Sequence, residues 1–208
     1  DDPRQRWTVE DLTAWIDGRR QSPKPATKGK KAARPVVFNG KKFFYTEHLA
    51  MEITARPNLV EEFLDSNELH QWLDRSLKNR PMLDAVNEAA RTSRRISSTR
   101  SQQFQHRLAA RVAMALHPSA PIRYKNLSLL PSGASAAITE SYALNKEVES
   151  VHELMANDDF YFWLNHNKDS VWDINSLYSQ FETCRGFVQT TVPGYGLERC
   201  VYFLNTEA

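Results

Sequence analysis

The sequence has 208 residues, of which 41% are hydrophobic and 25% charged, and this composition is typical of a globular protein. It contains no run of about 18 apolar residues, so it predicts no membrane span. Two cysteines, Cys184 and Cys200, are too few for a disulfide framework. They are expected to be reduced, partly buried thiols of a cytoplasmic protein.

Charge is distributed unevenly along the chain. The formal net charge is +2, but residues 21–42 hold seven of the 27 basic residues and no acidic one. The rest of the chain therefore has 20 basic and 25 acidic residues and is mildly acidic. A basic segment is thus attached to an acidic body.

The first predicted helix spans residues 8–20. Thr8 can cap it, and apolar residues recur at helical spacing, with Trp15 in the apolar stripe. Residues 21–35 contain three prolines, one glycine and no large apolar residue, so they are predicted to form a linker or a strap. Residues 36–44 predict a short β-hairpin, because apolar residues flank the Asn39-Gly40 dipeptide that a type I′ turn favours.

From residue 47 onward the pattern is helical almost to the end, and prolines separate the segments. The polar, basic stretch 91–100 is expected to be a mobile loop between two helices. The predicted helices span residues 47–55, 58–64, 67–78, 81–93, 99–116, 133–144, 147–156, 159–166, 170–190 and 195–204. The sequence therefore predicts a mainly α fold.

The two halves of the chain resemble each other. Residues 62–73 align without a gap with residues 153–164, and both segments have a polar turn between two apolar helical stretches. Trp72 and Trp163 match in this alignment. Each is predicted to be a structural anchor of the core, because a tryptophan on an apolar helical face usually packs.

Two further pairs of segments extend the likeness. Residues 37–40 resemble residues 123–126, and residues 108–117 resemble residues 196–205. The second pair places Arg111 opposite Arg199, and we favour a structural role for both arginines. The sequence therefore predicts two related helical repeats, at 36–118 and 119–208, each preceded by a short β-hairpin. The alternative is that both halves are simply amphipathic helices of similar period.

The common catalytic and metal-binding motifs do not occur in the sequence. The seven glycines form neither GxGxxG nor GxxxxGK, and His106-Arg107 is not followed by a catalytic Asp. The six histidines lack the spacing of metal ligands. The chain is therefore predicted to be no enzyme and to use no cofactor or metal. An unfamiliar enzyme site is the alternative, with these candidate residues: Tyr195, Glu198, Arg199 and His166.

The N-terminal segment reads Asp2-Pro3-Arg4-Gln5-Arg6-Trp7-Thr8 and leads into the first predicted helix. It resembles the last helices of eukaryotic-like protein kinase domains, in which an Asp-Pro, a nearby Arg and a Thr cap recur. The resemblance implies that Arg6 anchors a kinase C-lobe and that residues 1–20 are the tail of that lobe. The rest of the chain resembles the helical C-terminal extensions of some bacterial serine/threonine kinase-like proteins.

These observations predict a non-catalytic regulatory or protein-interaction domain of a bacterial serine/threonine kinase-like protein. Its partner would be another protein or its own kinase domain. The basic segment has three readings: a solvated linker, a strap that docks on the acidic body or on a kinase lobe, or a contact with nucleic acid or an anionic membrane. The alternative function is accordingly a nucleic-acid-associated module. The candidate binding residues are Lys24, Lys28, Lys30, Lys31 and Arg34.

Overall fold

The computed structural model of the chain describes residues 29–96, 101–130, 133–166 and 174–206, together with Thr13 and Ile16. The helix predicted at 8–20 and most of the predicted linker lie outside the described residues. So do these predicted site residues: Arg6, Trp15, Lys24 and Lys28. The described part is mainly helical, with two small antiparallel sheets of two strands each, and this confirms the predicted fold class.

The first half of the described chain is a hairpin followed by helices. Its last two helices are long, and the short α4 continues directly into a π-helical segment, η3. The elements are β1 (Val36–Phe38), β2 (Lys41–Phe43), α2 (Thr46–Ala55), the 3-10 turn η2 (Pro57–Leu59), α3 (Val60–Asp65), α4 (Glu68–Gln71), η3 (Trp72–Leu77), α5 (Arg80–Ile96) and α6 (Gln102–Leu116).

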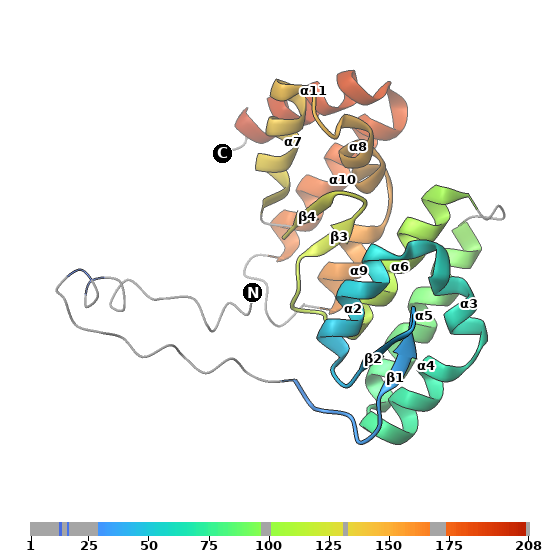
Figure 1. The fold of residues 1–208 in the computed structure, drawn as a ribbon. Coiled ribbons are helices and arrows are strands. Elements are labelled where there is room, and N and C mark those ends of the chain that lie inside the picture. Colours follow the sequence, from blue (N-terminus) through green and yellow to red (C-terminus); the bar gives the residue numbers. More distant parts are fainter. Residues whose placement is uncertain are drawn as a thin grey trace.

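As far as the structure describes it, the second half has the same order of strands and α-helices, without counterparts of η2 and η3. These elements are β3 (Ile122–Tyr124), β4 (Leu127–Leu129), α7 (Ala134–Leu144), α8 (Val148–Ala156), α9 (Asp159–His166), α10 (Ile174–Thr190) and α11 (Pro193–Thr206). In both halves the last two helices pack against each other, and the last one also packs on the helix that follows the hairpin. Figure 1 shows the first half in blue to green and the second in yellow to red, with α6 and α9 at the junction.

The two hairpins have the same register. In the first, Val36 pairs with Phe43 around an Asn39-Gly40 turn in which both residues have positive φ, as the sequence predicts. In the second, Ile122 pairs with Leu129, and Lys125 takes the left-handed conformation. Lysine is a poor signal for that conformation, so the second hairpin is less evident from the sequence.

In each half, a glutamate on a helix accepts hydrogen bonds from the hairpin. Glu52 of α2 accepts hydrogen bonds from Lys41 at 2.8 Å and from Asn39 at 3.0 Å, and these bonds lower the pKa of Glu52. Glu153 of α8 accepts a hydrogen bond from the Tyr124 hydroxyl at 2.6 Å. Burial of Tyr124 and this hydrogen bond raise the pKa of its phenol. Each hairpin therefore has a fixed orientation on its own half.

The prediction of a loop at residues 91–100 is wrong for residues 91–96, because α5 continues to Ile96. Ser93 is buried and donates a hydrogen bond to the carbonyl of Ala89 at 2.8 Å, and Arg94 forms an ion pair with Asp65 at 2.6 Å. The polar residues are therefore accommodated within a helix by local and long-range partners. Asp65 lies 29 residues before Arg94, so the local sequence around residues 91–96 does not reveal this ion pair.

Helix α6 is the centre of the molecule. Every residue from Arg107 to Leu116 is buried. The helix packs against α2, α3 and α5 of its own half and against β3 and α9 of the other half. A helix that is buried on all sides must be surrounded by other elements. Around α6 these elements come from both halves.

The two cysteines lie where α10 and α11 pack together. Cys184 and Cys200 are both free and buried, and the Cys200 thiol contacts the carbonyl of Cys184 at 3.5 Å. The contact with Cys200 and burial raise the pKa of the Cys184 thiol. Among the described helices, none is both long enough and apolar enough to cross a membrane.

Candidate functional site: a helix-docking groove

A buried ionic cluster joins the two halves of the molecule. Asp159, the first residue of α9, is fully buried, and its Oδ1 lies 2.6 Å from Nε of Arg111 and 3.7 Å from Nε of Arg107, both on α6. The Arg111 guanidinium also lies over the Phe162 ring, 5.5 Å from its centroid. The first turn of a helix favours a carboxylate such as that of Asp159.

Arg107 experiences two opposing effects in this cluster. Burial lowers the pKa of Arg107, and the neighbouring Asp159 carboxylate opposes that change. An arginine keeps its charge in proteins, so the cluster holds two cations around one carboxylate. Such a buried pair is costly to break once formed. Asp159 therefore fixes α6 against α9.

Each of the two tryptophans makes the same type of hydrogen bond. The indole nitrogen of Trp163 donates to the carbonyl of Ala120 at 2.9 Å, and that of Trp72 donates to the carbonyl of Arg34 at 2.7 Å. Each acceptor lies two residues before the first strand of its hairpin. In both halves, therefore, the helix with the tryptophan is tied to the start of the hairpin.

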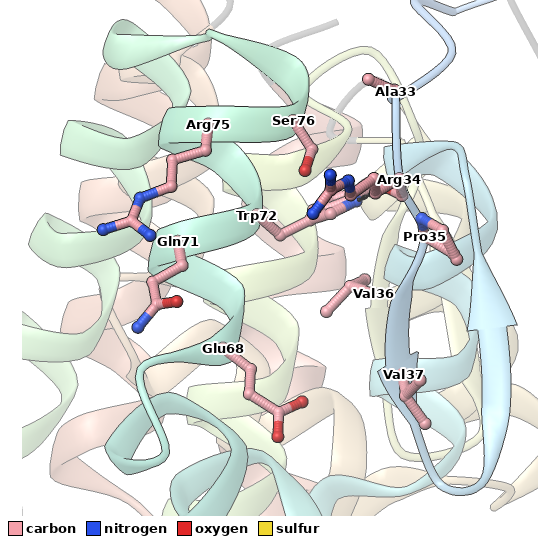
Figure 2. Close-up of a pocket in the computed structure, with 10 residues that line it drawn as sticks. All are labelled: Ala33, Arg34, Pro35, Val36, Val37, Glu68, Gln71, Trp72, Arg75 and Ser76. Carbon is pink, nitrogen blue, oxygen red and sulfur yellow. Dashed lines mark hydrogen bonds between the residues drawn. The ribbon is translucent and has the colours of Figure 1, made fainter.

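In the first half these two elements leave a groove between them. The groove has a volume of about 530 Å³. Figure 2 shows the segment before β1 and the start of that strand forming one wall, with α4 and η3 forming the other. Trp72 and Val36 are buried at its base, whereas Glu68, Gln71 and Arg75 are exposed along the helical wall. The lining residues are Ala33, Arg34, Pro35, Val36, Val37, Glu68, Gln71, Trp72, Arg75 and Ser76.

The second half has a surface built from the matching residues. There Trp163 matches Trp72, and Asp159 matches Glu68. That surface is filled by helix α6, which packs on both β3 and α9. A cavity of only about 10 Å³ remains between α6 and the segment that leads into β3. Among the described residues, the groove of the first half is therefore the open counterpart of a surface that already holds a helix.

The predicted basic residues do not form one cluster in the described part of the chain. Lys30 is exposed, and the Lys31 ammonium lies 5.2 Å from the centroid of the Phe44 ring. Arg34 is exposed and lines the groove, where its carbonyl accepts the Trp72 hydrogen bond. Because Lys24 and Lys28 lie outside the described residues, binding of nucleic acid through this segment stays a prediction.

Arg111 and Arg199, which match in the sequence, lie in different surroundings. Arg111 is buried against Asp159, whereas Arg199 is exposed on α11 with its guanidinium 4.4 Å from the centroid of the Phe187 ring. Tyr195 is also exposed on α11. His166 lies at the end of α9, with its Nδ1 2.8 Å from the carbonyl oxygen of Phe162.

Sequence reasoning did not single out Asp159, Arg107 or Glu68. One signal could have found two of them, because the alignment of residues 62–73 with 153–164 places Glu68 opposite Asp159. Within the described ranges, no group of three or more His, Cys, Asp or Glu side chains could hold a metal ion.

Comparisons with protein-family models, with curated proteins and with solved structures found no match to this chain.

Proposed function

We propose that this chain is a non-catalytic protein-interaction module that binds an amphipathic helix in the groove between β1 and α4. The observation that carries the proposal is the correspondence between this groove and the surface that holds α6 in the second half. Both have a tryptophan at the base and an acid at the start of the helical wall. Binding an amphipathic helix in a groove is a recurrent mode of peptide recognition.

The chemistry of α6 indicates which helix would fit. Ala110 and Met114 of α6 line the narrow cavity beside β3, and Arg111 reaches the carboxylate of Asp159. Small side chains allow two backbones to approach closely, and arginine forms strong charge-assisted hydrogen bonds with a carboxylate. The ligand of the groove is therefore a helix that carries an arginine placed to meet Glu68.

A selection from a library of helical peptides tests this proposal. Peptides selected on the purified chain are expected to share an arginine on the helical face that enters the groove. The Glu68→Arg variant should bind them at least about tenfold more weakly, because it replaces attraction by repulsion. Fluorescence anisotropy of labelled peptides measures the dissociation constants.

The matched control is Glu62→Arg, which makes the same charge change at an exposed residue of α3. Peptide affinity is expected to be unchanged in this variant. Selected peptides that bind both variants as well as the original chain would show that the groove is not the binding site.

We further propose that the module serves a bacterial serine/threonine kinase-like protein in the cytoplasm. The support is the resemblance of residues 2–16 to the end of a kinase C-lobe, followed by a basic linker. Removing residues 36–208 from the full-length protein is expected to change its kinase activity or its capture of a protein partner. Phosphorylation assays and pull-down experiments on the two proteins measure this, and equal results in both would contradict the proposal.

A further inference from the structure

We infer that the helix held by the groove is α11 of a second copy of this chain, so that copies associate head to tail. This inference rests on the proposed function, because it names the occupant of the same groove. Its basis is that α6 and α11 are matching helices of the two repeats. Helix α6 docks on the second half, and α11 presents the corresponding face outward.

The exposed face of α11 occupies the same helical positions as the docked face of α6, and Arg199 matches Arg111. In α11, Tyr195 and Tyr202 are 56% and 74% exposed, and Glu198 and Arg199 between them are also exposed. The residues that match these in α6 are all buried where the two halves meet: Arg107, Ala110, Arg111 and Met114. The opposite face of α11, which includes Leu197 and Cys200, is buried in its own half as the matching face of α6 is.

The charges at the two ends of the molecule are complementary. Within one chain, Arg111 meets Asp159 at 2.6 Å. On the exposed face of α11, Arg199 matches Arg111. In the groove of the first half, Glu68 matches Asp159, and both Arg199 and Glu68 are exposed. A second copy that docks as α6 does brings the Arg199 guanidinium to the Glu68 carboxylate. The contact between copies would repeat the contact between halves.

The proposed contact between copies differs from the contact between the two halves in ways that favour reversible association. Gln71 stands in the groove where the second half has Phe162. On α11, tyrosines stand where α6 has Arg107 and Met114, and Glu198 stands where α6 has Ala110. Tyrosine tolerates water on a free surface and still contributes a large contact area when buried. The groove also has the volume, about 530 Å³, to accept side chains of that size.

The geometry is heterologous, because the groove of one copy receives the helix of the next. In a pair, the copy whose groove is filled keeps a free α11 face, and the copy whose α11 is bound keeps a free groove. Such contacts close into a ring or continue as a filament, and they do not stop at a symmetric dimer. Association should therefore proceed beyond two copies as the concentration rises.

Sedimentation velocity of the full chain over a concentration series tests the inference. The original chain is expected to show a sedimentation coefficient that increases with concentration. Glu68→Arg and Arg199→Glu should each weaken self-association roughly thirtyfold or more, because each places like charges at the contact. The matched controls are Glu62→Arg and Lys146→Glu, which alter exposed residues elsewhere and should leave association within about twofold of the original.

Mixing the two single variants is the decisive measurement. The Glu68→Arg chain keeps an intact α11, and the Arg199→Glu chain keeps an intact groove, so the mixture is expected to associate although neither variant does so alone. Circular dichroism should show that each variant remains folded. A mixture that stays monomeric overturns the inference.

A full chain whose sedimentation coefficient does not change with concentration also overturns the inference. That result would include the case in which residues 8–20 of the same chain fill the groove. The proposed function is tested separately, because arginine-bearing peptides would still distinguish the original chain from Glu68→Arg if the groove binds some other helix. If those peptides fail to do so, the proposed function itself is contradicted.

Discussion

Replacing Asp159 by alanine is expected to lower the free energy of unfolding by about 3–5 kcal/mol. The carboxylate is fully buried between Arg111 and Arg107, and it lies 2.6 Å from Nε of Arg111. Its removal leaves two buried cations close together without a counter-charge. Chemical denaturation followed by circular dichroism measures the change.

The adjacent residue supplies the control. Asp158 forms an ion pair with Arg185 at 2.9 Å, but its side chain is 45% exposed, so Asp158→Ala should cost less than about 1 kcal/mol. Equal losses in the two variants would show that burial of Asp159 does not determine its effect. A triple variant that replaces Asp159, Arg107 and Arg111 by apolar residues should recover much of the lost stability, since no charge then remains buried.

The Trp163→Ala variant is expected to lose about 3–5 kcal/mol of stability through the cavity that it leaves. Trp163 is buried and donates a hydrogen bond to the carbonyl of Ala120. Trp163→Phe keeps much of the packing but removes that donor, so it should cost about 1–3 kcal/mol. If the two halves are equivalent, Trp72→Phe should cost a similar amount, because Trp72 makes the same bond with Arg34. Thermal and chemical unfolding curves measure these differences.

Tyr195→Ala provides the comparison for the tryptophan variants. Tyr195 is an aromatic residue that is 56% exposed, so its replacement should change stability by no more than about 0.5 kcal/mol at concentrations where the chain is monomeric. A loss as large as that of Trp163→Ala would mean that the unfolding experiment does not report on core packing.

Local patterns were sufficient to predict most of the architecture. Apolar periodicity and proline positions predicted the helices of both halves, and Asn39-Gly40 predicted the first hairpin with its turn. The C-terminal end of α5 could not be predicted in this way. Its polar residues are stabilised in part by Asp65, a residue distant in sequence, and a local pattern contains no information about such partners.

The candidate groove could be predicted only in part. The alignment of the two halves contains the matching tryptophans and acids, so the relevant residues were visible in the sequence. What was not visible is that α6 extends its contacts from its own half to α9 and β3. That contact decides which of the two matching surfaces is filled and which is open. It depends on tertiary packing and leaves no periodic signal.

The position of α6 also has a consequence for how the molecule unfolds. Residues 107–116 are buried by elements from both repeats, so separation of the halves would expose Arg107, Arg111 and the surrounding apolar side chains to solvent. Melting of one repeat therefore removes the environment that the other requires. The two halves share a pattern of elements, but they are expected to unfold as one cooperative unit, in which amide hydrogens of α6 exchange only through global unfolding.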